Sequence, residues 1–119
     1  MNIIIYGTKK CNNTKKAQRF FKERNIPFHF RDLAEKELVK GELNKISLKI
    51  PIEELIDKDG KQYKKRGLKF MVYNIEEELL EDTLLVKTPI VRNGNNFIVG
   101  NEPEIWKEWI EWIEWIENN

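Results

Sequence analysis

The first third of the chain switches from a continuous apolar run to helical spacing and then to alternation. Residues 2–6 are mostly β-branched or aromatic and end at a glycine, which is typical of a strand buried on both faces of a sheet. Residues 12–24 carry apolar side chains at helical spacing between charged ones, which indicates an amphipathic helix. Residues 27–31 alternate, with Phe28 and Phe30 on one face. The pattern predicts a β-α-β unit.

The middle of the chain shows no strand pattern. From about residue 33 to residue 86 the apolar positions suit short helices that are interrupted near Gly41 and Pro51. Residues 75–85 are predicted to form one of these helices, with Leu79 and Leu80 pointing inward. We therefore interpret residues 33–86, approximately, as a helical insertion.

A hairpin is predicted after this insertion. Residues 88–92 and 96–99 have the composition of short strands, and the Asn-Gly-Asn segment between them tolerates positive φ. Thr88-Pro89 opens the first strand, where a proline is tolerated and its peptide bond can be cis. The hairpin adds an antiparallel edge to the sheet.

The chain is predicted to close with an amphipathic helix over residues 102–116. Its predicted inward stripe consists of Ile105, Trp109, Trp112, Ile113 and Ile116. Trp106 and Trp115 fall outside this stripe, so their indoles are expected to be partly exposed. A broad core stripe with partly covered indoles is favoured over a partner-binding patch, because singly exposed apolar side chains are common.

These elements predict an α/β protein with a mixed sheet of about four strands, in the order β-α-β, helical insertion, β-hairpin and C-terminal helix. A length of 119 residues, 40% of them hydrophobic, suits one domain spanning residues 1–119.

Charge and hydropathy narrow the class of protein. A net charge of +1 with 34% charged residues gives no support for direct contact with nucleic acid. The apolar run at the N-terminus is too short for a signal peptide or a membrane span, so we expect a cytoplasmic protein without a membrane interaction. The single cysteine cannot form an internal disulfide, and no set of cysteines and histidines has zinc-ligand spacing, so no metal site is expected.

The single cysteine, Cys11, is the residue best placed for chemistry. It stands between the first strand and the first helix, where free backbone N–H groups and the helix dipole favour a thiolate. Thr14, Lys15 and Asn13 are predicted to stabilise that thiolate, through a hydroxyl, a positive charge and the start of the helix. The alternative is an inert, buried cysteine, which is common. The polar neighbours of Cys11 favour a reachable, reactive sulfur.

These segments resemble the arsenate reductase/Spx family. The resemblance rests on the strand-loop-Cys11-helix segment (residues 6–17), on Ile26-Pro27-Phe28, on residues 84–91 with their Thr88-Pro89 pair, and on Phe97-Ile-Val-Gly100 before an acidic helix. It implies a thioredoxin-like sheet with a helical insertion and a cis-proline at Pro89 beside Cys11. It also implies that Thr8, Thr88 and Pro89 bind the thiol substrate.

Two departures from the family pattern bear on the substrate. Glutaredoxin-coupled arsenate reductases carry an arginine before the cis-proline, where this chain has Thr88, and another in the insertion, where it has Asp57. A multiply charged oxyanion needs such donors, so arsenate reduction is not the expected activity. Spx-type regulators carry a Cys-X-X-Cys switch, and here its second position is Thr14, so that disulfide cannot form.

The function expected from the resemblance is that of a monomeric monothiol oxidoreductase. Cys11 would be the catalytic nucleophile that attacks an oxidised or mixed-disulfide substrate. Glutathione or a glutaredoxin- or thioredoxin-like protein would supply the second thiol. Glutathione would act as a co-substrate, with no cofactor held permanently. The alternative is a non-catalytic, Spx-like regulatory module that binds the RNA polymerase α-subunit.

Overall fold

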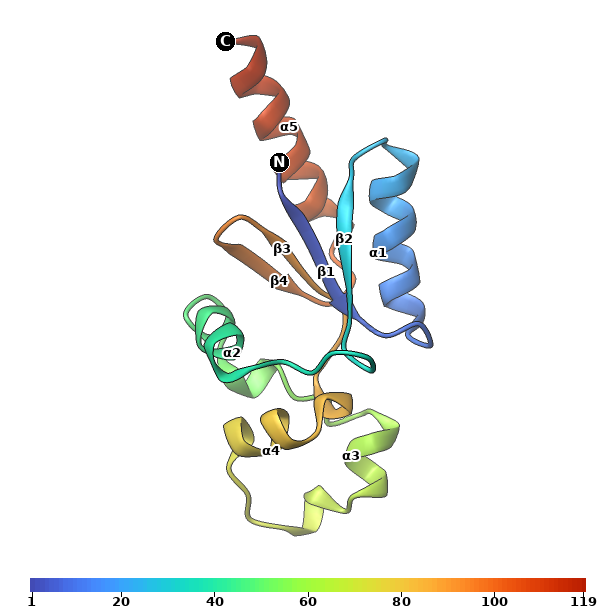
Figure 1. The fold of residues 1–119 in the computed structure, drawn as a ribbon, viewed down its shortest axis with the longest axis vertical. Helices are drawn as coiled ribbons and strands as arrows, with labels where there is room; N and C mark the ends of the chain where they lie inside the picture. Colours follow the sequence, from blue (N-terminus) through green and yellow to red (C-terminus); the bar gives the residue numbers. More distant parts are fainter.

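The computed structural model describes all residues from Met1 to Asn119 and contains a four-stranded mixed sheet (Figure 1). Strand β1 (Ile3–Gly7) pairs in parallel with β2 (Phe28–Asp32) and antiparallel with β3 (Ile90–Asn93). Strand β4 (Asn96–Val99) pairs antiparallel with β3, which gives the order β2-β1-β3-β4. Helix α1 (Asn12–Glu23) connects β1 to β2, and α5 (Pro103–Asn118) follows β4. The predicted thioredoxin-like α/β fold is confirmed.

The alternation of side chains along β1 divides the core into two. Ile3 and Ile5 pack with Phe21 of α1, Trp106 of α5 and Val91 of β3. Tyr6 points to the other face and joins the larger core, which is formed mainly by the residues between β2 and β3. A strand with both faces covered requires a continuous apolar run, and this explains the N-terminal sequence.

The segment between β2 and β3 is helical apart from one isolated bridge, and it forms the lower part of Figure 1. It consists of three α-helices and three short 3₁₀ turns: α2 (Lys40–Ser47), η1 (Ile52–Glu54), α3 (Lys61–Lys65), η2 (Leu68–Phe70), α4 (Ile75–Glu81) and η3 (Thr83–Leu85). The bridge between Ile56 and Val86 draws the segment together next to the sheet.

Two predicted element boundaries are wrong. The helix predicted over residues 75–85 ends at Glu81, because Asp82 adopts an extended backbone and its carboxylate accepts a hydrogen bond from the N–H of Leu84. The strand predicted from Thr88 begins at Ile90, since Pro89 follows a cis peptide bond and lies before the strand.

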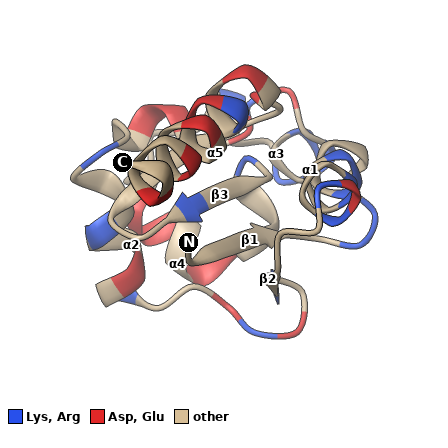
Figure 2. Cartoon of the chain, turned by 90° about the horizontal axis from the view of Figure 1, so that it is seen from above, with Lys and Arg blue, Asp and Glu red and all other residues tan.

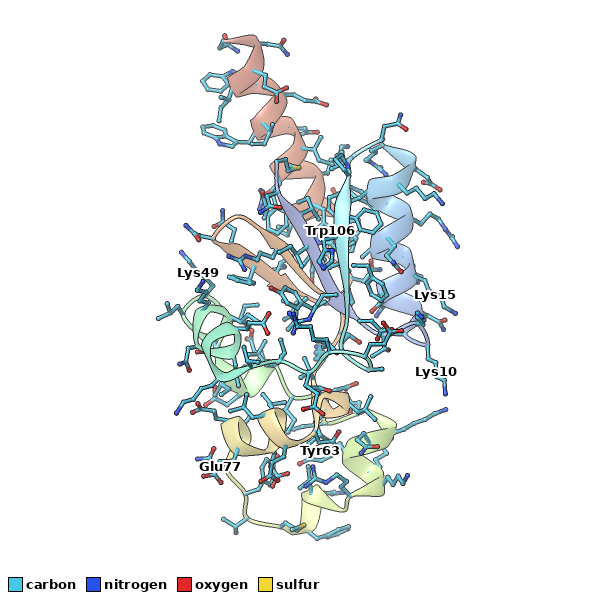
Figure 3. The ribbon with its side chains drawn as sticks, in the orientation of Figure 1. Lys10, Lys15, Lys49, Tyr63, Glu77 and Trp106 are labelled. Atoms are coloured by element: carbon cyan, nitrogen blue, oxygen red, sulfur yellow. The ribbon has the colours of Figure 1, made fainter.

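The predicted inward stripe of the C-terminal helix is partly wrong. Trp106, predicted to lie outside the stripe, is 1% exposed and lies at the centre of the smaller core (Figure 3). Trp112 and Ile116, predicted to lie inside it, are 61% and 47% exposed. The last turns of α5 extend past the sheet, so no element covers these side chains (Figure 1). Trp115 is exposed as expected.

None of the helices combines the length and the apolar character that are needed to cross a lipid bilayer.

Candidate functional site

Cys11 is the residue immediately before α1 and has an extended backbone. Its N–H donates to the carbonyl of Thr8 at 3.2 Å, and its carbonyl accepts from the N–H of Lys15 at 3.1 Å. The first of these bonds closes the turn after β1, and the second begins the helix. Because the first N–H groups of a helix have no partners within it, the sulfur lies where those donors are free. The side chain is half-buried.

A residue distant in sequence completes the surroundings of the sulfur. The Cys11 Sγ lies 3.6 Å from the carbonyl oxygen of Thr88, to which the thiol donates a hydrogen bond. The Thr88–Pro89 peptide bond is cis, as the family resemblance implies, and Pro89 is buried. Strand β3 starts at Ile90 beside β1, so the pairing of these two strands brings residues 88 and 89 to the end of the sheet where Cys11 lies.

Thr14 lies in the first turn of α1 and is fully buried. Its hydroxyl oxygen has no hydrogen-bond partner while the Cys11 thiol donates to Thr88. The side chain packs against Gly7, where an added Cβ would lie only 2.3 Å from the Thr14 hydroxyl. The glycine that ends β1 therefore leaves the space that Thr14 occupies. A buried hydroxyl without a partner is unfavourable, so an acceptor that forms nearby would be stabilised.

These contacts shift the ionisation of the thiol. Partial burial raises the pKa of Cys11, because it penalises the charged form, but the hydroxyls of Thr14 and Thr88 act in the other direction. With the N–H groups of Thr14 and Asn13 they lower the pKa below the usual value for a cysteine. The bond to the Thr88 carbonyl is open only to the protonated thiol. On ionisation the sulfur therefore loses its hydrogen bond to the Thr88 carbonyl and can accept hydrogen bonds from several nearby donors.

The lysines around Cys11 either form ion pairs with carboxylates or are exposed to solvent. Lys9 Nζ lies 3.2 Å from Glu35 Oε1 and 3.9 Å from Asp32 Oδ2. Lys10 and Lys15 are exposed, and Figure 3 shows both side chains pointing outward near the start of α1. Neither is among the groups that lower the pKa of Cys11.

Asp32 is a polar residue near this site that the sequence did not indicate. It ends β2 directly opposite Gly7 and is only 9% exposed. Its carboxylate accepts from the N–H of Ala34 and faces Lys9. The only sequence signal is an acidic residue immediately after an alternating strand. No three His, Cys, Asp or Glu side chains converge in the structure as they would around a metal ion.

The arrangement can support attack by a thiolate on another sulfur. The Cys11 side chain is half-buried, its ionised form has donors within the chain, and the Thr88 backbone faces it from the neighbouring loop. A nucleophilic thiolate needs these features, whereas an inert structural cysteine would lie among apolar side chains.

Comparison with known proteins gives a consistent result. The model of the ArsC family matches residues 6–109. The global transcriptional regulator Spx 2 of Oceanobacillus iheyensis is 30% identical over 106 residues, which cover 84% of this chain and 77% of that protein.

Solved structures show the same similarity. An ArsC family related protein from Bacteroides fragilis is 26% identical, with a TM-score of 0.77 over 91% of this chain and 97% of its own. The YffB (PA3664) protein has a TM-score of 0.80 at 20% identity, over 89% of this chain and 96% of its own, which supports the fold.

Proposed function

The chain belongs to the ArsC family, and we propose that it is a monothiol oxidoreductase that reduces a mixed disulfide between glutathione and a substrate thiol. The observation that carries this proposal is the half-buried Cys11 sulfur, which has a lowered pKa and faces the carbonyl of Thr88. A lowered pKa increases the fraction of thiolate at neutral pH, and the thiolate is the nucleophile.

The reaction proceeds in two exchanges of disulfide bonds. The Cys11 thiolate attacks the glutathione sulfur of the mixed disulfide, forms a Cys11–glutathione disulfide and releases the substrate as a thiolate. The thiolate of a second glutathione then attacks the glutathione sulfur of that adduct. This step forms oxidised glutathione and restores the Cys11 thiolate. The two electrons come from glutathione, and a glutaredoxin- or thioredoxin-like protein can supply the second thiol in its place.

The neighbouring residues have separate roles in this scheme. Thr14 and the N–H groups at the start of α1, including that of Asn13, stabilise the thiolate before attack and again as it leaves in the second exchange. The positive charge of Lys15 attracts glutathione, which is an anion. The carbonyl of Thr8 accepts from the Cys11 N–H and the carbonyl of Thr88 faces the sulfur. In this scheme Thr8, Thr88 and Pro89 bind the backbone of the glutathione moiety.

Arsenate is a poor candidate for the substrate. Thr88 stands before the cis-proline and offers a hydroxyl, and Asp57 lies in the helical segment as a carboxylate. Neither provides the fork of positively charged donors that binds a multiply charged oxyanion, and a carboxylate repels it.

We propose a monomer in a reducing compartment, the cytoplasm, as the working form. A protein with one cysteine depends on an external thiol, and such thiols are kept reduced there. No permanently bound cofactor is needed, since glutathione is consumed as a co-substrate.

The test is a turnover assay with a glutathionylated peptide, glutathione, and glutathione reductase to report oxidised glutathione. The wild-type protein should accelerate deglutathionylation, and Cys11→Ser should abolish this activity. Mass spectrometry of wild-type protein with oxidised glutathione alone should show one glutathione on Cys11. A Cys11 that alkylates with the pH dependence of a free thiol, near pKa 8.5, would falsify the proposal.

A second function is favoured by the 30% identity to Spx 2. In this alternative the chain is a non-catalytic regulatory module that binds the α-subunit of RNA polymerase. Binding to the purified C-terminal domain of this polymerase component can be measured directly, and it should survive the Cys11→Ser substitution. Binding without any deglutathionylation would establish the regulator and rule out the reductase.

A further inference from the structure

The C-terminal turns of α5 carry an unusual combination of exposed side chains. Trp112 and Trp115 are 61% and 57% exposed, and their rings stack at 5.3 Å with an angle of 16° between their planes. These turns extend beyond the sheet at the top of Figure 1, far from the start of α1. Two exposed, stacked indoles at the free end of a helix are more than an isolated exposed apolar residue, and they need an explanation.

The charge around the two indoles has a single sign. Glu108 and Glu111 line a shallow hollow together with Trp112 and Trp115. Beyond Lys107 the chain contains only acidic residues among its charged ones, and Figure 2 shows the acidic positions that recur along α5. We call the four residues of the hollow the acidic indole surface.

We propose that the acidic indole surface binds a Lys- or Arg-rich segment of a partner protein. The carboxylates of Glu108 and Glu111 attract a guanidinium or ammonium group, and the faces of Trp112 and Trp115 bind it through cation–π contacts. Stacking covers the inner face of each indole and leaves the two outer faces open to a cation, one on each ring. The stems of Lys and Arg side chains pack against the same rings.

The charge of this surface selects against other classes of ligand. Nucleic acid and anionic membranes carry negative charge, and the glutamates of α5 repel both. A second copy of this chain offers lysines around α3, such as Lys61 and Lys64. Self-association is therefore an outcome of the test that would overturn the proposal.

The experiment is an NMR and fluorescence titration of the full chain with a short Arg/Leu peptide as the probe. A Glu/Leu peptide of equal length is the negative control. The Arg/Leu peptide should shift the indole N–H signals of Trp112 and Trp115, and the signal of the buried Trp106 should stay in place. The paired substitution Trp112→Ser with Trp115→Ser should weaken binding roughly tenfold, as expected for two cation–π contacts.

Two further variants test whether binding of the peptide depends on the charge of the glutamates or only on exposed apolar side chains. Glu108→Gln with Glu111→Gln should weaken binding and reduce its dependence on salt. Phe70 and Val72 lie in the helical segment between β2 and β3 and are 87% and 104% exposed. Phe70→Ser with Val72→Ser removes these apolar side chains and should leave peptide binding unchanged. The paired tryptophan variant should retain the deglutathionylation activity of Cys11, so that failure of one proposal is distinguishable from failure of the other.

The proposal is overturned if the Arg/Leu peptide leaves the indole signals unmoved, if the Glu/Leu peptide binds equally well, or if the Phe70/Val72 variant loses as much affinity as the tryptophan pair. It is also overturned if the indole signals shift with protein concentration alone, because a second copy would then occupy the surface.

Discussion

Three residues, Gly7, Cys11 and Thr14, form a unit at the end of β1. The glycine leaves room for the Thr14 side chain, and the buried Thr14 hydroxyl has no partner until Cys11 ionises. The energy of an unpaired buried hydroxyl therefore disfavours the thiol form and favours the thiolate. The lowered pKa of Cys11 therefore results from packing within the chain, and the exposed lysines are not among its causes.

Replacing Thr14 by valine should raise the pKa of Cys11, because a hydrogen bond to the charged sulfur is lost. The protein should be as stable as the wild type or slightly more stable, since valine removes an unpartnered hydroxyl and fills the same space. Thiolate absorbance against pH measures the first quantity and urea unfolding the second. Thr14→Ser retains the hydroxyl and should keep the lowered pKa. An unchanged pKa in the valine variant would remove Thr14 from the thiolate site.

Gly7→Ala should both destabilise the protein and raise the pKa of Cys11. The new methyl group would lie 2.3 Å from the Thr14 hydroxyl and 2.9 Å from its Cβ, so Thr14 must move, at a cost of about 1–3 kcal/mol. Adding Thr14→Ala to Gly7→Ala should restore part of the stability and none of the pKa shift. Recovery of both quantities in the double variant would contradict a positioning role for Gly7.

At the scale of elements, the strength of each local pattern decided what could be predicted. The β1-α1-β2 unit was recognisable from a continuous apolar run, a helical period and an alternating strand. The β3-β4 hairpin was recognisable from its Asn-Gly-Asn turn. The end of α4 was missed, since it depends on the side chain of Asp82 as a cap. Cys11 and Thr14 could be proposed from spacing. The contact between Cys11 and Thr88, which are 77 residues apart, was available only through the family resemblance.

Helix α5 shows why a dense apolar sequence hides its buried face. With Trp or Ile at nearly every second or third position, several stripes of similar width fit the same sequence. The sheet selects the stripe that contains Trp106, which contacts Phe20 and Phe21 of α1. The length of the sheet then leaves the last turns uncovered. Neither the packing of Trp106 against α1 nor the length of the sheet can be predicted from the local sequence pattern of α5.

Because Trp106 is buried and Trp115 is exposed, alanine substitutions at these two positions of α5 should have different effects on stability. Trp106→Ala should destabilise the protein by about 3–5 kcal/mol, as is typical of removing a buried aromatic side chain. Trp115→Ala, at a position that is 57% exposed, should change stability by less than about 0.5 kcal/mol. Urea unfolding followed by circular dichroism measures both. Equal losses would mean that the end of α5 is covered in solution.

At the scale of the whole molecule, the sheet and the helical segment are held together by a few polar links as well as by the larger core. Arg31 of β2 forms a bidentate ion pair with Glu42 of α2, and Glu42 also accepts from the N–H of Val39. The hydroxyl of Thr83 donates to the carbonyl of Leu33 at 3.0 Å. These contacts fix α2 and η3 to the end of β2, beside the loop that carries Cys11.

The Arg31–Glu42 pair should make the stability of the protein depend on pH in the acid range. Burial raises the pKa of Glu42, but the hydrogen bonds from Arg31 and Val39 outweigh it and hold this pKa below its usual value of 4.5. A carboxyl group with a lowered pKa in the folded state stabilises the protein fully above its unfolded pKa. That contribution is lost as the pH falls below 4.5 and through the folded value. Arg31 stays charged throughout.

Glu42→Gln should therefore lower stability at neutral pH by about 2 kcal/mol, the scale of hydrogen bonds to charged groups, and should flatten the decline in acid. Urea midpoints measured from neutral pH down to about pH 3 test both effects. Glu35→Gln is the matched control, because its side chain is 70% exposed and its pair with Lys9 contributes little. If stability falls with pH in the same way in both variants, the Arg31–Glu42 pair does not stabilise the contact between the helical segment and the sheet. The packing of the larger core would then stabilise that contact alone.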